Sequence, residues 1–183
     1  MMPEISLNVL DVAQNSVTAG SRLTEIIISI DIAADTLNVI INDDGSGMTP
    51  EQATSVIDPF FTTRTTRKVG LGIPFMKMAA EFTGGGYRME SAPGKGTKVS
   101  AVFGLTHIDR MPLGDIAETM TSLIGPNPDL DFILRYCVNE NGFSMDTREI
   151  RQVLEGIPLS EPEVLGYISD FINENIDALG ARF

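Results

Sequence analysis

Apolar residues recur with two different periods in the first half of the chain, and each period predicts a different element. Every third or fourth residue is apolar over residues 3–19, which is the spacing of a helix with one buried face. Gly20 is a natural end for that helix. Isoleucine-rich runs follow at residues 24–32 and 36–41, and they predict two strands that pair as a hairpin.

Two further helices and a second hairpin are predicted from the residues at their ends. Thr49-Pro50-Glu51-Gln52 has a threonine cap, a proline at the first helical position and a glutamine three residues after the cap. Gly70-Leu71-Gly72-Ile73 opens another helix, which a run of three glycines ends soon after Phe82. Residues 87–91 and 97–105 then predict two strands joined by a glycine-rich turn.

A further helix and hairpin are predicted beyond these elements. Residues 113–124 place apolar side chains at helical spacing, so they predict an amphipathic helix. Residues 130–138 and 143–145 predict a hairpin. Because Asn-Gly is a strong two-residue turn, we expect this hairpin to turn at Asn141-Gly142.

Two capping boxes and a change of charge mark the last part of the chain. One box begins at Asp146 and the other at Ser160, and each precedes an amphipathic pattern. Residues 106–183 hold 14 acidic residues against 5 basic ones, whereas residues 1–105 hold 11 against 8. We therefore predict one domain over residues 1–105 and a small acidic α/β appendage over residues 106–183.

The composition narrows the classes of partner. The chain has a formal net charge of −12 and is 43% hydrophobic, which is ordinary for a soluble protein. An acidic surface disfavours binding to nucleic acid or to an anionic membrane. No apolar run is long enough to span a bilayer, and the acidic first residues are not typical of a signal peptide. With Cys137 as its only cysteine, the chain is expected to be cytoplasmic.

The candidate binding site begins where the second predicted strand ends, in Asn42-Asp43-Asp44-Gly45-Ser46-Gly47-Met48. A carboxylate followed by Gly-x-Gly favours a tight turn that a ligand can approach closely. A surface turn without a ligand is the alternative. A calcium-binding loop counted from Ile40 would also match several positions, but Ile40 would then occupy the first ligand position and cannot serve there. Calcium is therefore the weaker interpretation.

The first helix carries a second candidate. Asp11 and Asn15 are four residues apart, with Asn8 one turn earlier, so the three side chains share one stripe. A carboxylate and an amide on one stripe could hold a hydrated metal ion and orient a water molecule. The alternative is a solvated polar face.

A cationic segment precedes the Gly70 helix. Residues 58–69 are rich in threonine and arginine and suggest a loop that covers a site, although an ordinary exposed loop would have the same composition. Glycines immediately before a helix leave amides free, and these amides favour phosphate. Gly94-Lys95-Gly96-Thr97 lacks the upstream glycine and the following helix of a P-loop, so it is expected to be a strand turn.

Four separated motifs resemble the nucleotide-binding boxes of the GHKL ATPase superfamily. These motifs are Asp11-x3-Asn15, Asp43-x-Gly45-x-Gly47, Gly70-Leu71-Gly72-Ile73 and Gly96-Thr97. The stretch 70–97 looks most like the histidine kinase ATPase domain, and the segment around Asn15 looks more like the mismatch-repair version. The resemblance implies an α+β fold: a two-layer sandwich of the Bergerat type, with a mixed sheet and helices on one face. The small C-terminal α/β appendage would follow it.

The resemblance implies an adenine pocket at the Asp43 motif. Asp43 would accept a hydrogen bond from the adenine amino group. Gly45 and Gly47 would let the base lie against the backbone, with Met48 packing on it. Thr97 would lie near the hydrogen bonds on the adenine side.

The same resemblance implies a phosphate and magnesium site beside that pocket. Asn15 would carry Mg²⁺, which neutralises the phosphates of ATP. The phosphates would be bound by backbone amides and loop cations, from Gly70, Leu71, Gly72, Arg64, Arg67 and Lys68. Asp11 stands where the family usually has a catalytic glutamate, so its shorter side chain bears on hydrolysis more than on binding. Thr18 stands where histidine kinases often have a basic residue.

The expected function is that of an ATP- and Mg²⁺-binding, histidine kinase-like protein, similar to free-standing anti-sigma-factor kinases. It would phosphorylate or conformationally switch a protein partner, with the acidic segment as the recognition element, and could form a homodimer. The alternative is a nucleotide-sensing module with little catalysis. His107, the only histidine, lies in a stretch that resembles a phosphoacceptor box, although a simple linker is the other interpretation.

Overall fold

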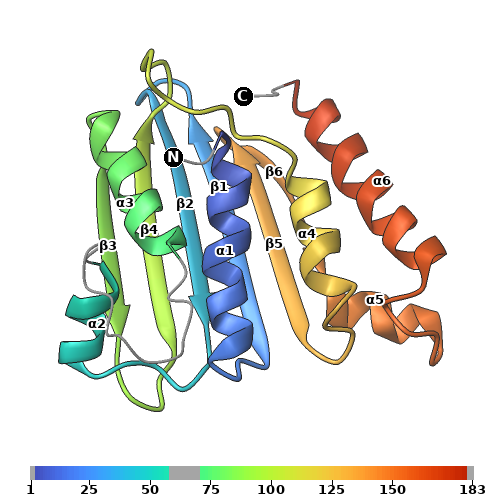
Figure 1. Cartoon of the computed structure of the whole chain (residues 1–183). Helices are drawn as coiled ribbons and strands as arrows, with labels where there is room; N and C mark the ends of the chain where they lie inside the picture. The colour runs from blue at the N-terminus through green and yellow to red at the C-terminus, as the bar shows by residue number, and fades with distance from the viewer. Residues whose placement is uncertain (1–2, 58–70, 181–183) are drawn as a thin grey trace.

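A computed structural model describes residues 3–57 and 71–180 of the chain, and it contains one mixed sheet covered by helices (Figure 1). The sheet order is β3-β4-β2-β1-β5-β6. In chain order the elements are α1 (Ile5–Thr18), β1 (Leu23–Asp31), β2 (Thr36–Asp43), α2 (Pro50–Ile57), α3 (Gly72–Phe82), β3 (Gly86–Ser91), β4 (Thr97–Gly104), α4 (Ile116–Ile124), β5 (Asp131–Val138), β6 (Asn141–Asp146), α5 (Thr147–Leu154) and α6 (Pro162–Ala178).

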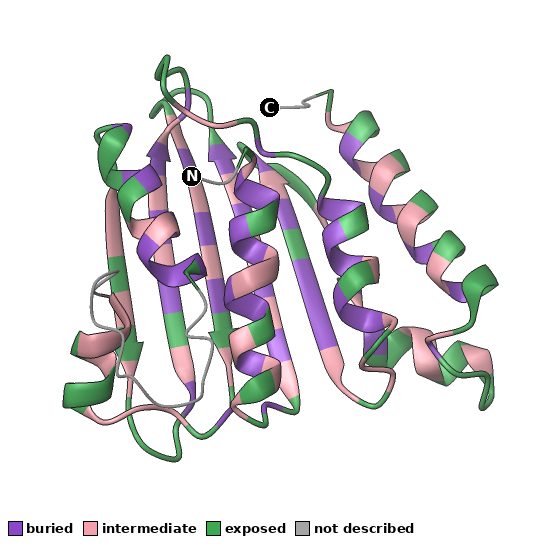
Figure 2. Ribbon diagram, in the orientation of Figure 1, coloured by how far each residue is buried: buried purple, intermediate pink, exposed green. Residues whose placement is uncertain are grey.

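The strand β1 lies inside the sheet and determines its topology. It pairs antiparallel with β2 on one side and parallel with β5 on the other. Along β1 and β2, buried residues alternate with less buried ones, which is typical of strands with only one covered face. Helices α3, α1, α4 and α6 follow one another across that covered face (Figures 1 and 2). The expected two-layer α+β fold is confirmed.

The core is continuous along the whole sheet. Met76 of α3, Met120 of α4 and Phe132 of β5 have no exposed surface and belong to a single cluster of buried residues. The strand β5 follows the predicted boundary at residue 105, yet all of it pairs with β1. The segments on either side of residue 105 therefore share one sheet and one core. The division of the chain into an ATP-binding part and an acidic appendage with a separate role stays a prediction.

Most local predictions are confirmed, including both early hairpins and the cap of α2. Thr49 and Gln52 form the predicted reciprocal box: the Thr49 amide donates to Gln52 Oε1 at 2.9 Å, and the Gln52 amide donates to Thr49 Oγ1 at 3.3 Å. At α5, the Asp146 side chain accepts from the Arg148 amide. At α6, the predicted Ser160 cap is wrong, because Glu161 is the N-cap residue and Pro162 opens the helix.

The predicted turn of the β5–β6 hairpin is also wrong. Asn141 already pairs with Val138, so the turn consists of Asn139 and Glu140. Asn139 adopts a φ of 52°, which asparagine tolerates better than most residues. Its side chain also accepts a hydrogen bond from the Ile32 amide at 3.0 Å. This long-range contact favours Asn139 as the turn residue over the Asn-Gly pair two positions later.

None of the helices in the described part of the chain is long and apolar enough to cross a membrane.

Candidate functional site

A pocket of about 340 Å³ opens between α1, α2 and the adjacent ends of β2 and β4. Of the residues predicted for the site, Asn15, Asp43, Gly47, Met48 and Thr97 line it. The remaining lining residues that carry polar side chains are Ser16, Thr18, Ser46 and Gln52, and the apolar ones are Val12, Ala19, Ile41, Val56, Ile73 and Val99. The pocket thus brings together segments that are more than eighty residues apart.

Asp43 is fixed by three hydrogen bonds at the end of β2. Its Oδ2 accepts from the Ser16 hydroxyl at 2.8 Å, and its Oδ1 accepts from the Gly45 amide at 2.9 Å and the Thr97 amide at 3.2 Å. An ionised carboxylate can accept about four hydrogen bonds, so one acceptor position remains on Oδ2. Because Asp43 lines the pocket, that position is the natural contact for an N–H donor of a ligand.

Ser91 links the segment after β2 to the start of β4 through hydrogen bonds. Its hydroxyl oxygen accepts from the Met48 amide at 2.9 Å, and it lies 3.0 Å from the Gly96 carbonyl and 2.9 Å from Thr97 Oγ1. Sequence reasoning missed both Ser91 and Ser16. Ser16 directly follows Asn15 and could have been found by asking which side chain would satisfy Asp43. Ser91 gave no signal of its own in the sequence.

The glycines of the site are required by close packing of the chain on itself. A Cβ on Gly45 would lie 2.9 Å from Ala19 Cβ and 3.0 Å from Asp43 Oδ1. Gly47, at a φ of 64°, faces the Ala92 carbonyl, and Gly96, at a φ of 79°, faces the backbone carbonyl of Asp43. These contacts fix the walls of the pocket, whatever ligand occupies it.

Asp44 stabilises a turn of the backbone through its side chain. Although Asp44 is exposed, its Oδ1 accepts from the Ser21 hydroxyl at 2.9 Å and from the amides of Arg22 at 2.7 Å and Leu23 at 2.9 Å. Partial burial raises the pKa of Asp44, but these hydrogen bonds outweigh it and leave the pKa below its ordinary value. Asp44 therefore holds the turn between α1 and β1.

Asp11 lies against the start of α3. A Cβ on Gly72 would lie 2.5 Å from Asp11 Cβ, so only glycine lets the two helices approach this closely. Partial burial raises the pKa of Asp11 above its ordinary value. Asp11 does not line the pocket itself. Asn8, one turn earlier, is buried, and neither polar atom of its side chain has a hydrogen-bond partner among the described residues. The stripe is therefore not a solvated face at Asn8.

The start of α3 offers backbone donors. Leu71 is the N-cap residue and makes no capping hydrogen bond through its side chain, so the first amides of α3 are not satisfied by a cap. Leu71 is also 44% exposed, which leaves this helix end accessible. Gly70 and the predicted loop cations Arg64, Arg67 and Lys68 lie outside the described residues.

A metal ion at this site would depend on few protein ligands. Within the described ranges, no group of three or more histidine, cysteine, aspartate or glutamate side chains could hold a metal. Mg²⁺ typically binds through one or two protein oxygens together with substrate phosphates and water. Asn15, at the edge of the pocket, fits that mode.

His107 lies far from this pocket. Thr97, at the pocket, begins β4, and His107 follows the other end of that strand. Seven residue steps of about 3.3 Å separate the two ends of β4 by roughly 23 Å. Thr97 and His107 therefore lie toward opposite ends of the sheet.

Comparison with known proteins assigns the family. The model of the "Histidine kinase-, DNA gyrase B-, and HSP90-like ATPase" family matches residues 4–107, which is more than half of the chain. The chain is a GHKL ATPase. Its Asp43 pocket is formed within the matched residues.

Sensor kinases are among the curated relatives of this GHKL ATPase. It is 35% identical over 88 residues to "Sensor histidine kinase ZraS" of Klebsiella oxytoca, covering 48% of this chain and 19% of that protein. It is 30% identical over 90 residues to "Sensor protein DegM" of Bacillus sp. (strain B21-2), covering 49% of this chain and 24% of that one. The chain thus matches only about a fifth to a quarter of these relatives' lengths.

Solved structures extend the similarity of fold beyond the family match. The "Aquifex aeolicus MutL ATPase domain complexed with ADP" has a TM-score of 0.50 at 13% identity, covering 85% of this chain and 70% of that one. The "N terminal domain of a DNA repair protein" has a TM-score of 0.52 at 13% identity, covering 79% and 52%. A coverage of 85% must include residues after 107, so the shared fold extends into the C-terminal segment.

Proposed function

We propose that this GHKL ATPase binds ATP with Mg²⁺ in the Asp43 pocket and uses the nucleotide to phosphorylate or conformationally switch a protein partner. The observation that carries the proposal is the Asp43 carboxylate, which lines the pocket with one acceptor position left on Oδ2. A fixed acceptor of this kind selects ligands that present an N–H donor.

The hydrogen bonds of Asp43 favour adenine over guanine. Adenine presents its exocyclic amino group as a donor, whereas guanine has a carbonyl oxygen at the equivalent position. A carboxylate can bind the adjacent N–H groups of guanine only through both oxygens. Asp43 Oδ1 already accepts two backbone amides, so a single donor is the better match.

The phosphates would extend toward α1 and α3. Asn15 would supply an oxygen to Mg²⁺, and the amides at the start of α3, after Leu71, would bind phosphate oxygens. The family match and the similar fold of the MutL ATPase domain complexed with ADP support this arrangement. Gly70 and the cations Arg64 and Lys68 are proposed to complete it.

Catalysis would depend on Asp11. A carboxylate with a raised pKa is a better proton acceptor than an ordinary aspartate, which suits a general base. Asp11 precedes Asn15 by one helical turn, so both would act on the phosphate side of the nucleotide. The sensor kinases among the relatives favour a protein as phosphoryl acceptor.

Binding is tested by thermal unfolding with ATP, ADP and GTP, each with and without Mg²⁺. At a ligand concentration of 100 times Kd, we expect stabilisation of about 2.7 kcal/mol, which raises Tm by roughly 5–10 °C. The shift should be larger with ATP than with GTP. Asp43→Asn should remove this preference, because an amide nitrogen then faces the adenine amino group.

Asp44→Asn is the matched control, since it changes the neighbouring carboxylate that binds only the α1–β1 turn. It should lower Tm but keep the preference for ATP. Equal shifts for ATP and GTP in the natural chain, or no shift with either, would contradict the adenine assignment.

Turnover separates the kinase from the nucleotide-sensing module. Asp11→Asn should keep the ATP-dependent Tm shift and abolish phosphate release or transfer to a partner. If the natural chain binds ATP but shows no turnover with any protein tested, the sensing module is the better description.

A further inference from the structure

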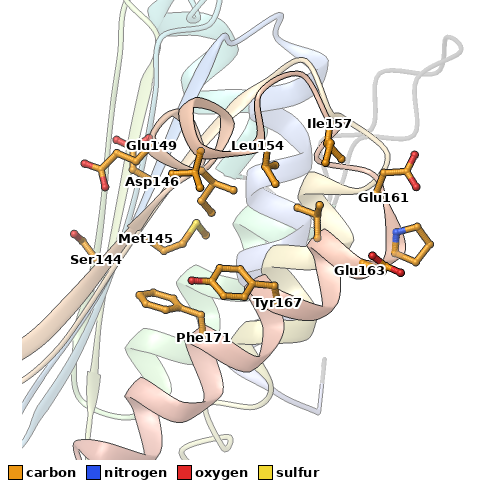
Figure 3. Close-up of a pocket in the computed structure, with 14 residues that line it drawn as sticks. Ser144, Met145, Asp146, Glu149, Leu154, Ile157, Glu161, Glu163, Tyr167 and Phe171 are labelled. Atoms are coloured by element: carbon orange, nitrogen blue, oxygen red, sulfur yellow. The ribbon is translucent and has the colours of Figure 1, made fainter.

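A second hollow, of about 770 Å³, lies in the C-terminal segment between β6, α5 and α6 (Figure 3). We call it the C-terminal groove. It is lined by Ser144, Met145, Asp146, Glu149, Ile150, Val153, Leu154, Ile157, Glu161, Pro162, Glu163, Val164, Tyr167 and Phe171. None of these residues lines the Asp43 pocket, and none falls within the family match at residues 4–107.

The walls of the groove are largely apolar, and part of that apolar surface is exposed. Val153 of α5 is 81% exposed, Ile157 is 53% exposed and Tyr167 of α6 is 64% exposed. Isolated exposed apolar residues are ordinary, but a contiguous apolar hollow marks an interaction surface. On the short helix α5 only Thr147 is completely buried. Ile150 and Leu154 pack partly against the core, and Val153 is left exposed at the groove.

Aromatic side chains give the groove a rigid floor. Phe143 of β6 lies edge-on to Phe171 of α6, with ring centroids 6.0 Å apart, and Phe171 stacks with Tyr167 at 6.5 Å. In Figure 3, Tyr167 and Phe171 project from α6 toward Met145. Rigid aromatic residues of this kind are enriched among the anchor residues of protein interfaces.

The rim of the groove is acidic. Glu149, Glu161 and Glu163 line it, and none of them makes an ion pair within 4.0 Å in the described part of the chain. Asp146 is the exception, because it pairs with Arg148 at 2.6 Å. No lysine or arginine is among the lining residues. The groove therefore combines an apolar centre with carboxylates that make no close ion pair among the described residues.

We propose that the C-terminal groove binds a basic amphipathic helix of a protein partner. Two walls of the groove present apolar side chains at helical spacing. One wall is α5, with Ile150, Val153 and Leu154, and the other is α6, with Val164, Tyr167 and Phe171. Such ridges accept the apolar face of a third helix. Lysine or arginine beside that face would meet Glu149, Glu161 and Glu163.

Charge selects this occupant over others. A second copy of the chain docked groove to groove would bring the same three glutamates together, and like charges oppose that contact. An anionic membrane is disfavoured for the same reason. A basic helix is attracted from a distance, since residues 106–183 hold nine more acidic than basic residues.

The test uses the full chain and a fluorescent synthetic helix with leucine along one face and lysine on both flanks. Fluorescence anisotropy should show saturable binding. Binding should weaken as salt is raised. A peptide of the same composition in scrambled order, which has no apolar face, should bind at least three-fold more weakly. A version with glutamate in place of lysine should not bind.

Two variants locate the binding in the groove. The double variant Glu161→Gln, Glu163→Gln should weaken peptide binding roughly three- to ten-fold. Its control is the double variant Glu140→Gln, Glu174→Gln, which changes exposed acidic residues outside the groove and should leave binding unchanged. Val153→Ser should also weaken binding, and Ile108→Ser, at an even more exposed position, is its control. All six substituted positions are exposed, so the fold and the ATP-dependent Tm shift should be retained.

Three results would overturn the proposal. One is equal binding of the ordered and scrambled peptides, and another is equal weakening by the groove and control variants. The third is a dimer in sedimentation experiments that Val153→Ser dissociates, because the groove would then be an interface between copies of this chain.

Discussion

The Asp43 pocket and the C-terminal groove are built in opposite ways. In the Asp43 pocket, the carboxylate is already hydrogen-bonded by Ser16, Gly45 and Thr97, and glycines bring the backbone into contact with itself. In the C-terminal groove, glutamates make no ion pairs within the described residues, and apolar side chains such as Val153 remain exposed.

This difference separates recognition of a small ligand from recognition of a protein surface. A pre-organised carboxylate with one free acceptor position discriminates between ligands by a single hydrogen bond, at little cost in ordering. Unpaired charges around an apolar hollow attract a partner from a distance and tolerate variation in its sequence.

The first prediction concerns the continuity of the two regions. Phe132 of β5 has no exposed surface and pairs in register with Thr24 of β1. Phe132→Ala should lower the free energy of unfolding by about 3–5 kcal/mol, because it leaves a cavity in the shared core. Denaturant unfolding should remain one cooperative transition. Phe82→Ala, at a 60% exposed position, should cost less than about 0.5 kcal/mol. Two separate transitions would contradict the shared core.

The second prediction concerns the walls of the Asp43 pocket. Gly94 and Gly96 have similar positive φ angles of 72° and 79°, but only Gly96 faces another part of the chain, the Asp43 carbonyl. Gly94→Ala should therefore cost about 1–2 kcal/mol, from backbone conformation alone. Gly96→Ala should cost more and should also reduce the ATP-dependent Tm shift. Equal losses for the two variants would show that the close approach does not matter.

The third prediction uses the lowered pKa of Asp44. A carboxyl group with a lowered pKa in the folded state stabilises the fold above its unfolded-state pKa, and this stabilisation is lost as the pH falls through the folded-state value. Asp44→Asn should thus lower Tm at neutral pH, and the difference from the natural chain should shrink in acid. A difference that is constant with pH would mean that the charge of Asp44 is not involved.

The smallest effect is expected at Asp11, and its sign is opposite. Because burial raises the pKa of Asp11, the folded state favours the protonated form, and the ionised form destabilises the fold as the pH rises above the ordinary value of 3.8. Asp11→Asn should raise Tm slightly at neutral pH and should leave Tm unchanged at pH values below 3.8. A lower Tm at neutral pH would indicate that the Asp11 carboxylate is stabilised by its surroundings.

Local sequence patterns were sufficient for most of the fold around the pocket. The reciprocal cap of Thr49 and Gln52, the first hairpin and the turn at Gly94 each depend on residues close together in the chain. The Asp43 motif also marks its own position, since a carboxylate and two glycines at the end of a buried strand have few structural roles. Such short-range features can be recognised without knowledge of what packs against them.

Features that depend on distant segments could not be predicted in this way. The turn at Asn139 depends on the Ile32 amide, and the role of Asp44 depends on amides about twenty residues earlier. The Ser16 and Ser91 contacts of the pocket are equally non-local. A single serine carries no periodic pattern, so only its spatial neighbours reveal its role.

The helices, the hairpins and the order of the nucleotide-binding motifs can be read from local patterns, because periodicity and end signals act over a few residues. The parallel pairing of β5 with β1 is evident only in the folded chain, since a parallel pair requires a long connection whose path no local pattern encodes. The same is true of the C-terminal groove. Its walls come from a strand and two helices whose separate patterns indicate buried faces but not which of those faces remains uncovered.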